Sequence, residues 1–154
     1  MVSNIKLTAD NLTDCPYYLV SRVSLLVTSA LKKALQEGGV EEVRPAYLGV
    51  LMSLWHQDGV KGVALAQRAG LEPSTMTELL DRMEGDQLVL RTKAPGDRRA
   101  QLIQLTDKGH KLQKPVLKVL DRALPQVFQG ISKAEMALTK DVLRRILKNA
   151  QQGK

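Results

Sequence analysis

Two short amphipathic segments, separated by a tight turn, restrict what this 154-residue chain can fold into more than any other feature. The first segment covers residues 62–69 and is followed by Gly70, a residue type that often ends helices. The second begins at Pro73, which suits the first turn of a helix because its missing N–H has no helical partner there. Within it, apolar residues recur at i, i+3, i+4 and i+7, which predicts one buried face: Met76, Leu79, Leu80 and Met83. Two short helices joined in this way predict a helix-turn-helix motif.

A β-hairpin is predicted directly after the second helix. Residues 88–92 and 100–105 are strand-like, and they flank the turn sequence Ala94-Pro95-Gly96-Asp97. A hairpin in this position forms the wing of a winged helix-turn-helix, with a wing sheet of two or three strands. Proteins with this motif place the N-terminal residues of the second helix in the major groove of duplex DNA.

The start of that second helix carries polar side chains that lie off its apolar stripe, so we expect them to face outward. They are Ser74, Thr75, Thr77 and Glu78. In a helix-turn-helix, these positions contact the edges of bases. The alternative is an ordinary solvated helix start, but the hairpin that follows at the right distance favours contact with DNA.

The predicted hairpin tip is basic and reads Lys93-Ala-Pro-Gly-Asp-Arg-Arg99. A tight turn that projects Arg98 and Arg99 suits a narrow minor groove, where the negative potential is enhanced. Asp97 would repel DNA if it were unpaired, so we expect it to orient Arg99 through an ion pair. Arg91 and Lys93 are expected to contact phosphates. The alternative is an exposed turn that is rich in charge and has no partner.

Helical patterns also precede the helix-turn-helix. The first covers residues 17–35 and ends at Gly38 and Gly39. A second follows Pro45, and four of its apolar side chains are expected to face inward: Leu48, Leu51, Met52 and Trp55.

Two further helices are predicted after the hairpin. Thr106 suits the N-cap of the first, and Pro115 predicts a kink or break within it. Ser132 and Glu135 match a capping box at the start of the last helix. The fold class is therefore mainly α (α+β), with one small sheet.

A long helix at each end of the chain has more apolar positions than one small core requires. This surplus predicts that the ends bury each other across a homodimer. We expect residues 1–154 to form a single domain, in which residues 45–109 form the winged lobe and residues 1–40 and 110–154 supply the dimerisation helices.

Composition excludes several classes of protein. Two histidines and one cysteine offer no metal-ligand spacing, and no nucleophile or phosphate-loop motif is present, so we expect neither an enzyme nor a cofactor. No apolar run is long enough for a membrane span, and no signal peptide is recognisable, which predicts a cytoplasmic protein. The net charge of +7 favours a polyanionic partner. The excess of basic residues lies in residues 106–154. Four of them form a stripe along one helix, Lys111, Lys114, Lys118 and Arg122. This stripe is either a solvated helix face or a surface for DNA or an acidic partner.

Residues 65–109 resemble the signature region of the MarR family of bacterial transcription regulators. They read LAQRAGLEPSTMTELLDRMEGDQLVLRTKAPGDRRAQLIQLTDKG, and the strongest matches are Asp81-Arg82, Asp97-Arg98-Arg99 and Leu105-Thr106-x-x-Gly109. The resemblance implies a homodimer that binds a pseudo-palindromic operator in double-stranded DNA, most simply as a repressor. It also implies that a small molecule or an oxidant tunes this binding.

Two residues depart from the family pattern. The family usually has a basic residue where this chain has Glu78, and the same helix also carries Asp81 and Glu84. The family glycine that ends this helix is expected at position 87, where this chain has Gln87. We therefore predict weaker attraction to phosphate and a shifted or strained turn into the wing.

Relatives in the family bind small aromatic acids in a cleft between the dimer helices and the reading helix. Four residues are candidates to line such a cleft for a small aromatic or phenolic effector: Tyr18, Tyr47, Trp55 and His110. For Tyr47 and Trp55 the alternative is core packing. Some relatives sense peroxides through an N-terminal cysteine, so Cys15 is either a redox trigger or inert. A third alternative, suggested by the acidic helix, is a winged-helix module that binds proteins and has little affinity for DNA.

Overall fold

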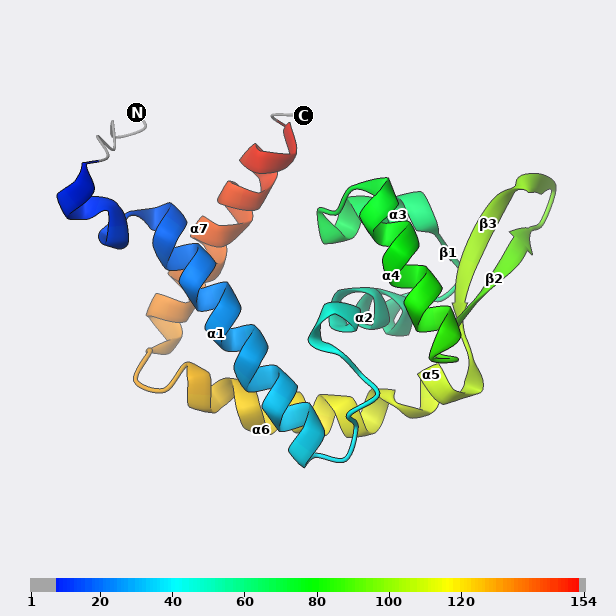
Figure 1. Ribbon diagram of the computed structural model, residues 1–154, viewed down its shortest axis with the longest axis horizontal. Coiled ribbons are helices and arrows are strands. Elements are labelled where there is room, and N and C mark those ends of the chain that lie inside the picture. The colour runs from blue at the N-terminus through cyan, green and yellow to red at the C-terminus, as the bar shows by residue number, and fades with distance from the viewer. Residues whose placement is uncertain (1–7, 153–154) are drawn as a thin grey trace.

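The computed structural model describes residues 8–152, without the side chains of residues 9, 10 and 97–100. A short 3-10 helix, Ala9–Asp14, leads into the long helix α1, Pro16–Glu37. The elements that follow in Figure 1 are, in chain order, the 3-10 helix Pro45–Tyr47, α2 (Leu48–His56), β1 (Val60–Lys61), α3 (Gly62–Ala69), α4 (Pro73–Gly85), β2 (Val89–Ala94), β3 (Asp97–Leu105), α5 (Asp107–Lys111), α6 (Gln113–Val127) and α7 (Lys133–Gln152).

The lobe from α2 to β3 has the predicted winged helix-turn-helix architecture. A turn at Gly70 joins α3 to α4, and β2 and β3 form the hairpin that extends from the lobe (Figure 1). The sheet is antiparallel with the strand order β1-β3-β2, so Ile103 of β3 lies between Val60 of β1 and Arg91 of β2. The fold is mainly helical with a three-stranded sheet, as the sequence predicted.

The core of this lobe is continuous from the end of α1 to the middle of α6. The whole apolar stripe predicted for α4 is buried in it, together with side chains from α2, the strands and α6. Its most completely buried large side chains include Tyr47, Leu51, Leu54, Leu65, Met83, Leu88 and Ile103. This packing fixes α4 against the sheet and leaves its polar face toward solvent.

The inward face of α2 differs from the prediction at one residue. Leu48 and Leu51 are buried and Trp55 is half-buried, but Met52 is 51% exposed. The buried residues of α2 are Leu48, Val50, Leu51 and Leu54, and Tyr47 just before the helix is buried as well, so the buried face is centred on Val50, Leu51 and Leu54 and excludes Met52. Because apolar residues occupy both stripes, the spacing alone could not select the correct one.

Three helices end with one residue in the left-handed conformation. After α1 and α3 this residue is glycine, with φ of 71° at Gly39 and 66° at Gly70. After α4 it is Gln87, at φ 60°, and no other non-glycine residue in the described part of the chain has a positive φ. The N–H of Leu88 donates to the Met83 carbonyl at 2.9 Å, as in a Schellman motif. The predicted strain at this turn is therefore present, because a Cβ disfavours this conformation.

The Leu105-Thr106-x-x-Gly109 motif fixes where α5 crosses the base of the wing. Thr106 Oγ1 accepts a hydrogen bond from the Gly109 N–H at 3.0 Å, which confirms the predicted cap. A Cβ on Gly109 would lie 2.2 Å from the Leu88 carbonyl oxygen, so only glycine fits at this crossing.

The helical segment after the wing is interrupted at Leu112, between α5 and α6, close to the predicted position. Pro115 lies in the first turn of α6, where its missing N–H needs no partner. In one continuous helix its ring would clash with the carbonyl of Lys111, four residues earlier. The break therefore follows from Pro115, as predicted.

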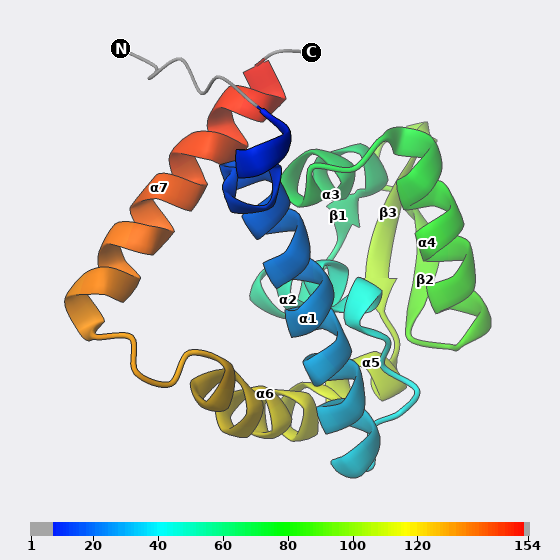
Figure 2. The ribbon, with the colours of Figure 1, turned by 60° about the vertical axis from the view of Figure 1, so that its left-hand side comes forward.

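α7 differs from the other helices because none of its residues is buried. It begins at the predicted capping box: the Ser132 N–H donates to Glu135 Oε2 at 2.8 Å, and the Glu135 N–H donates to Ser132 Oγ at 3.3 Å. The Ser132 hydrogen bonds hold the pKa of the Glu135 carboxyl below its usual value. α1 crosses α6, and α7 turns back from the end of α6 (Figure 2). Among the described residues, no helix is long and apolar enough to cross a membrane.

Candidate nucleic-acid interface

The outer face of α4 carries the four predicted base-reading residues, and all of them are exposed: Ser74, Thr75, Thr77 and Glu78. The Thr77 hydroxyl donates to the Pro73 carbonyl at 2.9 Å, so its proton is already used within the helix. Glu78 pairs with Arg82 one turn later at 3.9 Å. Both groups of this pair are largely exposed, so it is a weak contact.

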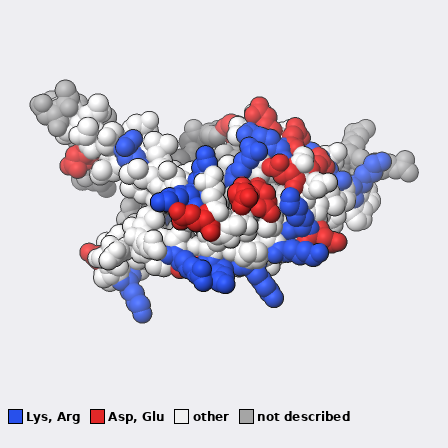
Figure 3. Space-filling view, turned by 60° about the horizontal axis from the view of Figure 1, so that its bottom comes forward, with Lys and Arg blue, Asp and Glu red and all other residues white. Residues whose placement is uncertain are grey.

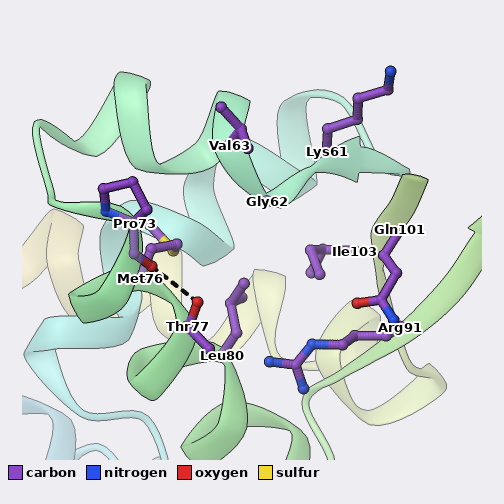
Figure 4. A pocket seen from close by; sticks show the side chains of 10 residues that line it. All are labelled: Lys61, Gly62, Val63, Pro73, Met76, Thr77, Leu80, Arg91, Gln101 and Ile103. Carbon is purple, nitrogen blue, oxygen red and sulfur yellow. Dashed lines mark hydrogen bonds between the residues drawn. The ribbon is translucent and has the colours of Figure 1, made fainter. Parts of the chain in front are cut away.

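A cavity of about 370 Å³ separates α4 from the wing and the start of α3. Figure 4 shows its apolar floor and its polar rim, which includes the guanidinium of Arg91 and the amide of Gln101. The lining residues are Lys61, Gly62, Val63, Pro73, Met76, Thr77, Leu80, Arg91, Gln101 and Ile103. The reading helix and the wing are thus neighbours with a gap between them.

Arg91 bridges the lower end of that gap. Its Nη2 lies 2.5 Å from Asp81 Oδ1, its Nη1 pairs with Glu84 Oε2, and its own N–H donates to Glu84 Oε1 at 3.2 Å. Burial lowers the pKa of the Arg91 guanidinium, but the hydrogen bonds to Asp81 and Glu84 outweigh burial and leave that pKa above its ordinary value. The phosphate contact predicted for Arg91 is therefore in competition with two carboxylates of its own chain.

Sequence reasoning missed this role of Asp81 and Glu84, which were interpreted as groups that repel DNA. A signal was present: the two acids are spaced i, i+3 on one helix face, and an arginine follows on the next strand. The pairing neutralises part of the acidic charge of α4. It thereby weakens the main argument for a winged-helix module without affinity for DNA.

The wing itself is described in part. Lys93 is exposed on β2, opposite Gln101 of β3. The chain turns at Gly96, whose φ is 78°. The side chains of Asp97, Arg98 and Arg99 lie outside the described residues, so their predicted roles stay predictions.

The four residues expected to line an effector cleft lie in different environments. Tyr47 is fully buried in the core of the winged lobe, and its hydroxyl donates to Asp86 Oδ2 at 2.7 Å. Burial and the Asp86 carboxylate both raise the pKa of Tyr47. Tyr47 is thus part of the core, which was the alternative interpretation.

Trp55 and His110 lie near each other at the base of the wing. Trp55 Nε1 donates to the Gly109 carbonyl at 3.0 Å, and His110 Nε2 is 3.3 Å from Asp58 Oδ2. Tyr18 is 36% exposed on α1. Cys15 is 5% exposed and caps α1 by accepting the Tyr18 N–H at 3.4 Å, so its structural role is evident and its predicted redox role stays a prediction.

A larger cavity, of about 570 Å³, lies between the C-terminal end of α7 and the turn of the helix-turn-helix. One wall carries Leu147 and Ala150 of α7, and the other carries Ala66, Leu71 and Pro73. The Gln151 side chain closes one edge by donating to the Gln67 carbonyl at 3.4 Å, a long hydrogen bond. No sequence signal identified this cavity, because its walls are about 80 residues apart along the chain.

The basic stripe runs along the exposed side of α5 and α6. Lys111, Lys114, Lys118 and Arg122 are all exposed. Figure 3 shows the face of the molecule that carries α6, with lysine and arginine side chains gathered along it and some acidic groups between them. Figures 1 and 2 place α6 on the opposite side of the winged lobe from the start of α4. A solvated helix face is thus the simpler interpretation.

Comparisons with known proteins agree with this architecture. The family model described as MarR family matches residues 45–100, which span the winged lobe. A MarR family transcriptional regulator from Rhodococcus sp. RHA1 is 34% identical, with a TM-score of 0.75 over 88% of this chain and 94% of that one. CouR from Rhodococcus jostii RHA1, solved with p-coumaroyl-CoA bound, is 32% identical, with a TM-score of 0.74 and the same coverage.

Two more distant relatives add information about activity. The structure of reduced AbfR bound to DNA is 25% identical, with a TM-score of 0.72 over 91% of this chain and 94% of that one. The HTH-type transcriptional repressor MdtR of Bacillus subtilis is 27% identical over 137 residues, covering 86% of this chain and 88% of its own length.

Proposed function

Because this chain belongs to the MarR family of transcriptional regulators, we propose that it binds double-stranded DNA sequence-specifically as a homodimer and represses transcription from a pseudo-palindromic operator. The observation that carries this proposal is the exposed polar face at the start of α4, which lies beside a hairpin wing. The DNA-bound state of AbfR, with a similar fold and 25% identity, supports it.

The reading residues have chemistry suited to base edges. The Thr77 methyl group can contact a thymine methyl group, and Ser74 and Thr75 can donate or accept hydrogen bonds. Glu78 can accept a hydrogen bond from cytosine N4 once it leaves Arg82. Lys93 contacts a phosphate from the wing. For the wing tip we keep the sequence-based proposal that Arg99 and Arg98 enter the minor groove and that Asp97 orients Arg99.

The proposed dimer uses both ends of the chain. Residues 1–40 and 110–154 supply the interface, and the apolar stripe of α7 supports this: Leu138, Val142, Leu143, Ile146 and Leu147 are all exposed in the single chain. Burying such a stripe against a second copy contributes roughly 25 cal/mol for each Å² of apolar surface removed from water. Each subunit then reads one half-site, about one helical turn of DNA from the other.

We propose that a small aromatic or phenolic effector modulates this binding from the cavity between α7 and the turn of the helix-turn-helix. The cavity lies between α7 and the helix-turn-helix, and a long hydrogen bond from Gln151 closes one of its edges. The p-coumaroyl-CoA bound to CouR supports an effector that contains a phenolic ring. The similarity to the repressor MdtR supports repression as the mode of regulation. A DNA-binding regulator of this kind acts in the cytoplasm.

The proposal is tested by fluorescence anisotropy of the purified protein with its own upstream DNA and with a scrambled duplex, across a salt series. We expect affinity for the upstream DNA at least ~10³-fold above that for the scrambled duplex, as in other specific complexes. A genome-derived duplex selection covers the case of an operator elsewhere. If neither the upstream DNA nor any selected duplex is preferred over the scrambled one, the proposal is wrong.

A further inference from the structure

Arg91 occupies a position that a phosphate contact does not require. It lies in the middle of β2, opposite Ile103, and its side chain is only 22% exposed. In Figure 4 the guanidinium points from the strand toward α4, beside Leu80. Both of its terminal nitrogens are bound to carboxylates of α4, Asp81 at 2.5 Å and Glu84. A side chain held in this way is directed at the reading helix and away from the wing tip.

The ion pairs of Arg91 with Asp81 and Glu84 connect the wing strand β2 directly to α4. The cavity described above lies between α4 and the wing, and the ion-pair cluster closes the gap at one end, beside the C-terminal half of α4. Arginine suits this role because its planar fork can hold two acceptors in one geometry, whereas a lysine ammonium cannot. α4 in the major groove and the wing in the minor groove can contact the same operator at the same time only if the position of one relative to the other is defined.

We propose that Arg91 is a positioning residue that sets sequence specificity by clamping the wing to α4 through Asp81 and Glu84, and that it makes no phosphate contact. This inference rests on the proposed function and assigns Arg91 a different role from the one its charge suggests. It also explains why α4 carries two acidic residues, because Asp81 and Glu84 bind the Arg91 guanidinium.

The first test needs no DNA and therefore stands apart from the proposed function. Amide hydrogen exchange is measured on the wild-type protein, Arg91→Gln and the double variant Asp81→Asn/Glu84→Gln. Exchange in the hairpin, residues 89–105, is expected to accelerate by roughly tenfold or more in both variants, while exchange in α1 stays unchanged. Unchanged hairpin exchange in the two variants overturns the clamp.

The second test separates positioning from phosphate contact by its salt dependence. In Arg91→Gln, operator affinity is expected to fall by about tenfold or more, the size of a mismatch penalty, while the salt slope stays at its wild-type value and scrambled-duplex affinity falls less than operator affinity. Lys93→Gln is the matched control from the same strand: it should reduce the salt slope by about 0.9 and weaken both duplexes equally. If Arg91→Gln behaves like Lys93→Gln, Arg91 contacts phosphate and the proposal fails.

Removing the acidic partners of Arg91 should change scrambled-duplex affinity in the opposite direction from removing a phosphate contact. Asp81→Asn/Glu84→Gln removes two negative charges near DNA, so binding to the scrambled duplex should strengthen, yet the ratio of operator to scrambled affinity should fall. Adding Arg91→Gln to this double variant should then change operator affinity less than about twofold, because the interaction is already lost. A full additional loss overturns the proposal. A wild-type protein that does not discriminate between duplexes contradicts the proposed function, and the exchange experiment still decides the role of Arg91.

Discussion

The winged lobe and the terminal helix α7 both carry apolar stripes, but the stripe is buried in the lobe and exposed in α7. In the lobe, every apolar residue of the α4 stripe is buried within the same chain. In α7 a stripe of apolar residues that also recur at helical spacing is exposed, and no residue of the helix is buried. Both helices carry an apolar stripe at helical spacing, so the pattern reports a face to be buried without saying which chain covers it. The lobe is complete by itself, whereas α7 is explained best by a second copy.

This contrast predicts that core changes in the lobe act at every protein concentration. Leu51 is fully buried, so Leu51→Ala should lower the free energy of unfolding by about 2–5 kcal/mol. Met52 is the matched control, because it is the next residue and is 51% exposed; Met52→Ala should change stability by less than about 0.5 kcal/mol. Urea unfolding at two protein concentrations measures both. Equal losses for the two variants would contradict the observed face of α2.

Changes in the α7 stripe should instead act on assembly. Leu143→Glu places a charge in the proposed interface and should weaken dimerisation by about a hundredfold or more, because an unpaired buried charge is strongly unfavourable. Ala137→Glu introduces the same residue on the opposite face of α7 and should leave the dimer intact. Sedimentation velocity over a concentration series measures the dimer directly. A dimer that tolerates Leu143→Glu would place the interface elsewhere.

The lobe should also show an alkaline loss of stability that traces to Tyr47. Its pKa is raised in the folded state by burial and by Asp86, so the stabilising contribution is complete below the unfolded value near 10 and is lost as the pH rises above it. At neutral pH, Tyr47→Phe should cost about 0.5–1.5 kcal/mol, the usual size of one lost hydrogen bond. Unfolding free energies from pH 7 to 11 should fall less steeply for Tyr47→Phe than for the wild type. Parallel curves would exclude this linkage.

The smallest expected effect concerns the one strained turn of the lobe. Gln87→Gly should stabilise the protein by about 1 kcal/mol, because glycine adopts a positive φ without the Cβ penalty. Gly70→Ala, at the equivalent position after α3, should have the opposite sign. Thermal unfolding of both variants provides the comparison. If Gln87→Gly destabilises the protein, the Gln87 side chain makes a contact that outweighs its backbone strain.

Much of the fold and part of the site could be predicted from the sequence because the signals were local. Gly70, Pro73, Thr106 and the Ser132–Glu135 capping box mark helix ends through the chemistry of the residues beside them, and all lie where predicted. The outward direction of Thr77 and its neighbours follows from helix geometry once the apolar stripe is recognised.

What the sequence by itself determined was thus the order of the main helices and of the hairpin, several helix ends and the family resemblance, since each depends on residues that are close along the chain. The hairpin strands are longer than predicted, and β1 was not predicted. Only the tertiary structure decided which of two overlapping stripes of α2 is buried, that Tyr47 belongs to the core and that Arg91 pairs with Asp81 and Glu84. The physical reason is the same in each case. A side chain with two possible environments takes the one in which partners from distant segments satisfy its burial or charge, and local spacing does not identify those partners.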